Sequence, residues 1–203
     1  MKIICIGRNY ADHAKEMNAP LPTQPVFFMK PDCALLKDGD DFYYPEFTSD
    51  LHYECEVVVK IDKVGKNILP KFAHKYYTKI SLGIDFTARD LQAICKEKGL
   101  PWERAKSFDN SAPISNLWLD KTNLDLENLS FSLNKNGTQV QHGNLNQLIF
   151  SIDEVIAYLS SFVTLKTGDL IFTGTPSGVG PVQIGDKLEG YIENQKMFSF
   201  DIK

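Results

Sequence analysis

The sequence predicts an α+β protein that is built mainly of β-strands and carries a few short helices. Apolar and polar residues alternate along several short segments, as they do in half-buried strands. The few helical segments have start and stop signals of their own. Strands and helices do not alternate regularly, which argues against a doubly wound parallel sheet. The chain has 203 residues, 43% of them hydrophobic, and no linker-like stretch, so we expect one domain over residues 1–203.

The chain begins with an apolar strand over residues 2–6, which leads into a short helix. Asn9 is the expected N-cap of that helix. His13 and Glu16 stand three residues apart, so both lie on one face of the helix. A carboxylate at this spacing can hold an imidazole in the orientation that takes a proton from water. The alternative is a solvated pair on the surface.

The next strands differ in what we expect of their charged residues. A strand over residues 26–29 ends at Lys30, which we expect at the surface, where most lysines lie. The segment LHYECEVVVK over residues 51–60 alternates with a period of two, so Glu54 and Glu56 share one face of a strand, about 6.6 Å apart along the chain. The other face is apolar. Taken alone, the two glutamates are also compatible with an ordinary half-buried strand.

A third carboxylate follows at Asp85. Residues 80–84 alternate as a strand that ends at this aspartate. A helix starts directly afterwards, where Thr87 and Asp90 have the spacing of a capping box, and Gly99 is its expected end. Asp85 therefore lies at a strand-to-helix junction, where its side chain can face a cleft.

Three carboxylates that converge, Glu54, Glu56 and Asp85, carry a charge that a protein interior must compensate. A hard divalent cation does this. An all-oxygen ligand set favours Mg²⁺ or Mn²⁺. Zinc is disfavoured because no cysteine or histidine falls at zinc-ligand spacing.

The second half of the chain adds one candidate cation and several turns. Lys106 is flanked by small uncharged residues; if it points into the cleft, its ammonium group can polarise a substrate carbonyl or neutralise a carboxylate. The Asn136–Gly137 dipeptide predicts a β-hairpin. Ser151 and Glu154 form a capping box for a further helix.

A glycine-rich loop over residues 174–180 resembles a phosphate-binding loop. It lacks the Lys-Ser/Thr ending and no helix follows, so nucleotide binding is not supported. Thr175 can hold a carboxylate oxygen through its hydroxyl group and the neighbouring amides; an ordinary tight turn is the alternative. Two strands around residues 194–195 complete the chain.

Composition narrows the class of partner. The net charge is −4 without basic clusters, so nucleic acid and anionic membranes are excluded as expected partners, and a small molecule is favoured. The four cysteines are scattered and are expected to be reduced core residues. Neither a signal peptide nor a membrane-length apolar run is found, so we expect a cytoplasmic location.

Several motifs together resemble the fumarylacetoacetate hydrolase family, in particular its short acylpyruvase and oxaloacetate decarboxylase branch. They are GRNYADHAKEM, Glu54-x-Glu56, GIDFTARDLQ, KGLPW, AKSFD and FTGTPSGVGPV. They appear in family order from Ile6 to about Gly185. The resemblance implies a β-rich mixed-sheet roll that forms a homodimer. The stretch after Lys106 varies among relatives, so the pocket for the substrate tail is not fixed by the resemblance.

The resemblance also implies roles for individual residues. Glu54, Glu56 and Asp85 correspond to the ligands of Mg²⁺ or Mn²⁺. The catalytic pair His13 and Glu16 would lie on a lid that orders over the substrate and activates water, with Lys106 as the active-site lysine. Four further residues match positions that line the substrate pocket: Arg8, Arg89, Gln92 and Thr175.

The expected function is that of a metal-dependent acylpyruvate hydrolase, which cleaves the C3–C4 bond of 2,4-dioxo acids and also decarboxylates oxaloacetate. In such a site, the 2-oxo acid chelates the metal through its carboxylate and keto oxygens, and the metal accepts the electrons of the enolate, assisted by Lys106. Related alternatives are an isomerase or hydratase of 2-oxo dienoic acids and an oxaloacetate tautomerase. An alternative of another class is a protein that binds 2-oxo acids without catalysis.

Overall fold

The computed structural model describes residues 1–17, 20–37 and 40–203. The strands in chain order are β1 (Ile3–Gly7), β2 (Val26–Lys30), β3 (Leu35–Lys37), β4 (Leu51–Tyr53), β5 (Cys55–Ile61), β6 (Tyr77–Ile84), β7 (Thr87–Ala88), β8 (Ala112–Ile114), β9 (Leu119–Asp120), β10 (Ser130–Lys135), β11 (Thr138–Asn144), β12 (Leu170–Phe172), β13 (Gly180–Pro181), β14 (Lys187–Ile192) and β15 (Gln195–Asp201). The α-helices are α1 (Ala11–Glu16), α2 (Pro70–Ala73), α3 (Arg89–Lys98), α4 (Glu103–Lys106) and α5 (Ile152–Phe162), and short 3₁₀ helices cover Asp32–Ala34, Lys121–Asn123 and Leu145–Gln147.

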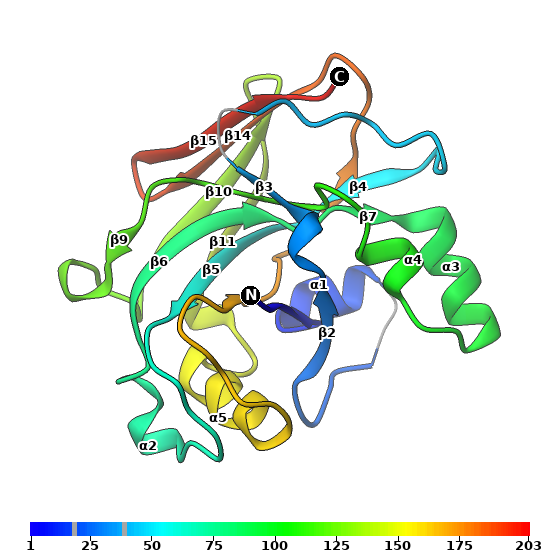
Figure 1. The fold of residues 1–203 in the computed structure, drawn as a ribbon. Coiled ribbons are helices and arrows are strands. Elements are labelled where there is room, and N and C mark those ends of the chain that lie inside the picture. Colours follow the sequence, from blue (N-terminus) through cyan, green and yellow to red (C-terminus); the bar gives the residue numbers. More distant parts are fainter. Residues whose placement is uncertain (18–19, 38–39) are drawn as a thin grey trace.

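The largest sheet of the described chain is mixed and curled (Figure 1), with the strand order β2-β1-β12-β5-β6-β8-β3 and β9 beside β6. The β1–β12 and β3–β8 pairs are parallel, and the other pairs of this sheet are antiparallel. Two smaller sheets have the orders β11-β10-β14-β15 and β13-β4-β7. The predicted fold class, a β-rich α+β roll with a few short helices, is confirmed.

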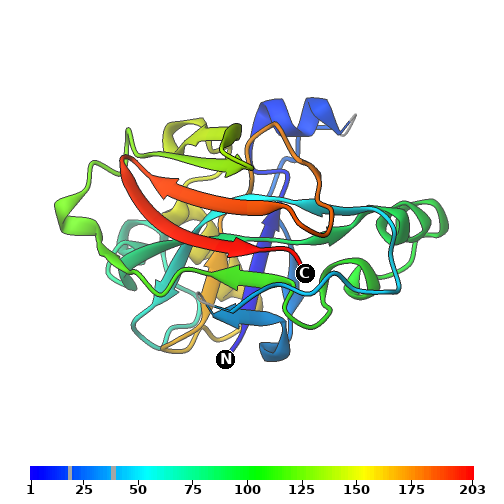
Figure 2. The same ribbon diagram turned by 90° about the horizontal axis from the view of Figure 1, so that it is seen from above.

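The core lies where the large sheet packs on the β11-β10-β14-β15 sheet, because β6 contacts both β14 and β15. Alternate residues of β5, such as Val57 and Val59, join Leu82, Phe131 and Leu188 in one buried cluster. The apolar face that the alternation of residues 51–60 predicted is therefore the core face. Figure 2 shows the blue helix α1 and the green helices α3 and α4 at different borders of the sheets. The polar face of β5 is turned toward the space between these helices.

The predicted continuous strand over residues 51–60 is wrong at one residue. Glu54 separates β4, which pairs with β7 and β13, from β5, which pairs with β6 and β12. The chain changes partner sheets here, and the Cys55 amide donates to the Gln141 side chain instead of to a strand. Local alternation does not reveal such a change, because both segments keep the same period.

Two predicted helix caps are also wrong. α1 has Tyr10 at its N-cap without a side-chain hydrogen bond, whereas Asn9 donates to the carbonyls of Phe150 and Thr173 and accepts from the Phe150 amide. α3 begins after Ala88, again without a side-chain cap. Asn9 and Asp90 are thus used for long-range contacts, the latter accepting from the Thr48 hydroxyl group, whereas the Thr87 hydroxyl group donates to the nearby Asp85 carbonyl. The Ser151–Glu154 capping box and the left-handed Gly99 at the end of α3 are confirmed.

No helix in the described part of the chain combines the length and the apolar character needed to cross a membrane. Cys5, Cys55 and Cys95 are buried and free, as expected of reduced core residues. Cys33 is free but exposed, contrary to that expectation.

Candidate active site

Three buried carboxylates meet at the junction of β4 and β5 and the end of β6. Each of Glu54, Glu56 and Asp85 offers an oxygen, and these atoms lie within 4.8 Å of one another. The backbone enforces this arrangement, because the Asp85 amide donates to the Glu54 carbonyl at 2.8 Å and Cys55 pairs with Ile84 across the sheet. The predicted acidic cluster is thus formed by strand register.

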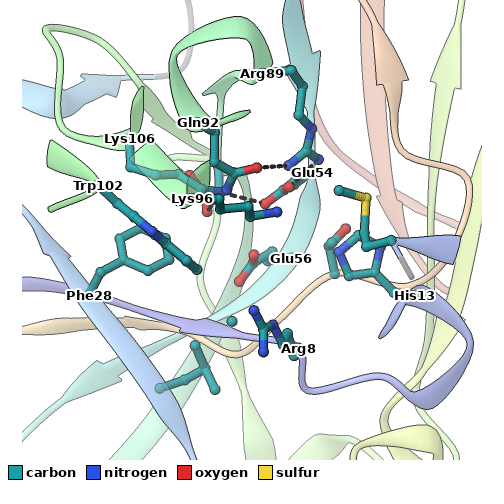
Figure 3. A pocket seen from close by; sticks show the side chains of 15 residues that line it. Arg8, His13, Phe28, Glu54, Glu56, Arg89, Gln92, Lys96, Trp102 and Lys106 are labelled. Carbon is teal, nitrogen blue, oxygen red and sulfur yellow. Dashed lines mark hydrogen bonds and ion pairs between the residues drawn. The ribbon is translucent and has the colours of Figure 1, made fainter. Parts of the chain in front are cut away.

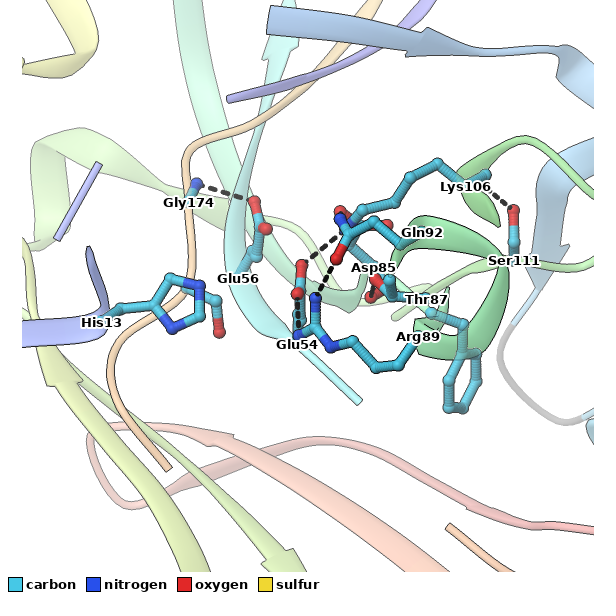
Figure 4. A network of polar contacts seen from close by, with 12 residues as sticks. His13, Glu54, Glu56, Asp85, Thr87, Arg89, Gln92, Lys106, Ser111 and Gly174 are labelled. Carbon is cyan, nitrogen blue, oxygen red and sulfur yellow. Dashed lines mark hydrogen bonds and ion pairs between the residues drawn. The ribbon is translucent and has the colours of Figure 1, made fainter. Parts of the chain in front are cut away.

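Cationic side chains pair with two of these carboxylates, and Figure 4 shows two of the cations, Lys106 and Arg89. Lys106 Nζ lies 2.7 Å from Glu54 Oε2 and 2.6 Å from Asp85 Oδ2. Arg89 pairs with the other oxygen of Glu54. Lys30 Nζ lies 2.8 Å from Asp85 Oδ1. Glu54 and Asp85 therefore have cationic partners within the protein itself.

Glu56 is held differently. Its carboxylate accepts a hydrogen bond from the Gly174 amide at 2.7 Å, and no ion pair among the described residues includes it. Burial, together with the negative charges of Asp85 and Glu54, raises the pKa of Glu56 well above its usual range. Burial also acts to raise the pKa of Glu54, but Lys106 and Arg89 outweigh it and hold that pKa well below its usual range. Glu56 is therefore the carboxylate of this cluster that has no cationic side chain paired with it among the described residues.

The donor set fits a hard divalent cation. The three carboxylates supply oxygen atoms alone, they are buried, and one of them has no compensating cation. Mg²⁺ and Mn²⁺ prefer such oxygen ligands. Within the described ranges this is the one cluster of three acidic, histidine or cysteine ligands that could hold a metal.

The predicted histidine–glutamate pair is formed on α1. His13 Nδ1 lies 3.2 Å from Glu16 Oε2, and the His13 side chain is buried. The Gly178 amide donates to Glu16 Oε1 at 3.1 Å. The glycine-rich loop thus fixes the carboxylate that orients the imidazole, a contact that the helical spacing could not predict. With Nδ1 engaged by Glu16, Nε2 is the nitrogen left for other partners.

A cavity of about 40 Å³ opens above the carboxylates (Figure 3). This volume holds a metal ion and bound water. Its lining includes all the predicted site residues except Glu16, which contacts His13 instead; the lining residues are Ile6, Gly7, Arg8, His13, Met17, Phe28, Glu54, Glu56, Asp85, Arg89, Gln92, Lys96, Trp102, Lys106 and Thr175.

Three of the four predicted pocket residues, Arg89, Gln92 and Thr175, have side-chain hydrogen bonds. Arg89 Nη1 donates to Gln92 Oε1 at 2.9 Å. The Thr175 hydroxyl accepts from Gln141 Nε2 at 2.9 Å, so its own proton is free to point into the cavity. Arg8 has a φ of 60°, a left-handed backbone that non-glycine residues adopt rarely.

The sequence was compared with the sequences and structures of known proteins. The family model described as fumarylacetoacetate (FAA) hydrolase C-terminal matches residues 2–199. The chain belongs to the fumarylacetoacetate hydrolase family.

Two members of the fumarylacetoacetate hydrolase family show how similar the chain is to curated proteins. It is 42% identical over 201 residues to the mitochondrial oxaloacetate tautomerase FAHD1 of Mus musculus, covering 99% of this chain and 91% of the relative. It is 43% identical over 189 residues to the mitochondrial oxaloacetate decarboxylase of Dictyostelium discoideum, covering 93% of this chain and 87% of the relative.

A solved structure of the family is also similar. It is the fumarylpyruvate hydrolase of Pseudomonas aeruginosa in complex with Mn²⁺ and pyruvate, with a TM-score of 0.93 and 38% identity, covering 100% of this chain and 89% of that chain. These relatives place the chain in a family of enzymes.

Two residues that build this site, Lys30 and Gln141, were not predicted from the sequence to belong to it. Lys30, expected at the surface, is buried; besides Asp85, it contacts the carbonyls of Phe86, Lys106 and Ser111. A lysine that ends an apolar strand is a weak signal, because the same pattern occurs at strand ends that face solvent.

Gln141 is the other missed residue. It accepts from the Cys55 amide at 2.9 Å and donates to the Thr175 hydroxyl and the Pro176 carbonyl. It thus connects the point where the chain leaves β4 to the glycine-rich loop. Nothing in the local sequence distinguishes it from other strand glutamines.

Proposed function

We propose that the protein is a divalent-metal-dependent hydrolase of acylpyruvates, with Mg²⁺ or Mn²⁺ held by Glu54, Glu56 and Asp85. The observation that carries the proposal is the pairing of His13 with Glu16 on the rim of a cavity whose floor is the carboxylate cluster. A candidate base and a candidate metal site therefore line the same small cavity. The similarity to a fumarylpyruvate hydrolase that was crystallised with Mn²⁺ and pyruvate supports the same assignment.

The metal, when bound, would supply a Lewis acid for the 2-oxo acid portion of the substrate. The protein's own groups do the rest. Glu16 fixes the His13 ring through Nδ1, so Nε2 can accept a proton from a water molecule that attacks the C4 carbonyl. Because His13 is buried, few competing waters reach the reacting atoms.

Breaking the C3–C4 bond leaves an acid and the enolate of pyruvate. The Lys106 ammonium group, held by Glu54 and Asp85, lies where it can stabilise the enolate charge. Those carboxylates also raise the pKa of Lys106 against the opposing effect of burial, so the group stays charged. His13 then transfers the proton that it took from water to C3 of the enolate, which gives pyruvate.

Arg89 and Gln92 act as a positioned pair beside this reaction. Gln92 accepts from Arg89 at 2.9 Å, which fixes the guanidinium plane and leaves other N–H groups to bind the substrate carboxylate. Thr175 can donate its hydroxyl proton to the same group, because Gln141 occupies the acceptor side of that oxygen.

A second candidate function is oxaloacetate tautomerisation or decarboxylation. The specific observation in its favour is the similarity to an oxaloacetate tautomerase and to an oxaloacetate decarboxylase. Both reactions pass through an enolate of a 2-oxo acid. The same Lys106 and His13 would serve, but the tautomerase would need no attacking water.

A coupled pyruvate assay tests the proposal. Purified protein is offered acetylpyruvate, fumarylpyruvate and oxaloacetate with Mn²⁺, with Mg²⁺ and with EDTA, and the enol absorbance of oxaloacetate is followed in parallel. If the protein is a hydrolase, it should release pyruvate from the acylpyruvates, and EDTA should abolish this release. Loss of enol absorbance without pyruvate would instead assign a tautomerase. Ligand binding by calorimetry without turnover of any of the three would contradict both assignments.

We also propose that the protein is a homodimer, as the family resemblance implies, and that it is cytoplasmic. Light scattering coupled to size-exclusion chromatography measures the first directly. A mass near the 22.9 kDa of one chain would contradict the dimer.

A further inference from the structure

More cationic than anionic side chains lie around the cavity. Glu54, Glu56 and Asp85 face five cationic side chains: Lys30, Lys106, Arg89, Arg8 and Lys96. The first three of these cations pair with the carboxylates. None of the ion pairs or hydrogen bonds found among the described residues uses the side chain of Arg8 or Lys96. Two positive charges therefore remain for a ligand.

The position of Lys96 follows from the geometry of α3. Arg89, Gln92 and Lys96 are spaced at i, i+3 and i+7, so the helical face that directs the first two into the cavity directs Lys96 there as well. Seven residues of helix span about 10.5 Å. Lys96 therefore lies farther from the carboxylate cluster than Arg89, which pairs with Glu54, and Lys96 is exposed at the surface. Figure 3 shows it among the labelled residues that line this space.

Lys96 is close to other cations. Its pKa is lowered by partial burial and by the positive charges of Arg89 and Arg8. Its ammonium group lies 6.0 Å from the centre of the Trp102 ring, which is stacked at a tilt on Phe28, with 5.9 Å between ring centres. Apolar rings and cations without ion-pair partners thus line the same cavity, an arrangement that suits a short carbon chain ending in an anion.

We propose that Lys96, together with Arg8, binds the distal carboxylate of the substrate, so that the site selects 2-oxo dicarboxylates over 2-oxo acids with an uncharged tail. The inference rests on the proposed function, and it adds a specificity-determining residue that the family motifs did not indicate. The carboxylate next to the keto group is bound near the acidic cluster, and the second one is bound by the two free cations. Arg8 lies across the cavity from the α3 residues Arg89, Gln92 and Lys96 (Figure 3).

The first test measures binding rather than turnover. Two five-carbon ligands of equal length are titrated by calorimetry into the Mn²⁺-loaded protein: 2-oxoglutarate, a dianion, and 2-oxopentanoate, a monoanion. The wild type should bind the dianion at least about tenfold more tightly, as expected of one additional charge-assisted contact. Lys96→Met keeps the length of the side chain and removes the charge, so it should abolish most of this preference.

Lys98→Met is the matched control. Lys98 is exposed and lies on the same helix nine residues after Arg89, which places it on the opposite face. It should leave the ratio of the two dissociation constants within about twofold of the wild-type ratio. Equal binding of both ligands by the wild type, or equal behaviour of the Lys96 and Lys98 variants, would overturn the inference.

The second test compares fumarylpyruvate, which has a charged tail, with acetylpyruvate, which does not. Lys96→Met should raise KM for fumarylpyruvate about tenfold while kcat stays within about twofold, and the acetylpyruvate parameters should not change. Equal losses on both substrates would contradict a role in binding the tail. If the wild type turns over neither substrate, the proposed function fails, and the calorimetric comparison still decides the role of Lys96.

Discussion

Replacing Lys30 by methionine removes one cation from a fully buried network without changing the volume of the side chain much. Lys30 is the one polar partner of Asp85 Oδ1 among the described residues, at 2.8 Å. It also donates to the carbonyls of Phe86 and Ser111 at 3.2 and 3.0 Å. Breaking a buried ion pair by removing one partner costs about 3–5 kcal/mol, because the other charge stays buried without compensation. We expect Lys30→Met to lose this amount of unfolding free energy.

The assay is urea unfolding without added metal, followed by tryptophan fluorescence, with thermal unfolding as a second measurement. For a chain of this size, each kcal/mol shifts Tm by about 2–4 °C, so we expect a decrease of about 6–20 °C. Lys63→Met is the control, because Lys63 is exposed and should change stability by less than about 0.5 kcal/mol.

A double-mutant cycle isolates the pair. If the cost of Lys30→Met comes from the charge left on Asp85, then the loss in Lys30→Met/Asp85→Asn should be smaller than the sum of the single losses by at least about 1 kcal/mol. Additive losses, or a Lys30→Met protein as stable as the Lys63 control, would refute the idea that Lys30 holds this metal-ligand candidate in place.

Three further predictions concern the same site. His13→Ala should lower kcat for acylpyruvates by about 10²–10⁴-fold, as expected for loss of a general base, and unchanged turnover would contradict its role. In metal-free protein, the raised pKa of Glu56 means that the folded state binds more protons than the unfolded state, so stability is fully present below about pH 4.3 and falls as pH rises toward the raised pKa; urea titrations should show Glu56→Gln gaining on the wild type from pH 5 to pH 8, and a constant difference would count against this. Gly174 has a φ of 109°, and an added Cβ would lie 2.7 Å from Asn9 Cβ, so Gly174→Ala should lose about 1–3 kcal/mol of stability by urea unfolding, whereas Gly137→Ala, with open space around it, should lose less.

Much of the site could be predicted because it depends on short-range pattern. The two-residue spacing of Glu54 and Glu56 and the end of the strand at Asp85 are local features, and pairing of β5 with β6 then brings the three side chains together. The spacing of His13 and Glu16 is likewise a property of one helical turn. The motifs of the family supplied the remaining pocket residues, which spacing alone did not indicate.

The missed features are contacts between residues far apart in the chain. Asn9 has the right position for an N-cap, but its amide instead joins Phe150 to Thr173. Lys30 has the local appearance of a surface residue and becomes buried because Asp85, 55 positions later, compensates its charge. A solvated cap and a surface lysine are the usual local outcomes, and tertiary contacts override them.

The most direct test of the account is equilibrium binding of Mn²⁺, measured by the loss of its free electron paramagnetic resonance signal. If the three carboxylates hold one divalent cation, we expect one site per chain in the wild type, and a strong loss of affinity in each of Glu54→Gln, Glu56→Gln and Asp85→Asn. Thr78→Ala, at an exposed position on β6, should bind like the wild type. Mn²⁺ binding that survives in all three carboxylate variants, or is absent from the wild type, would contradict the account.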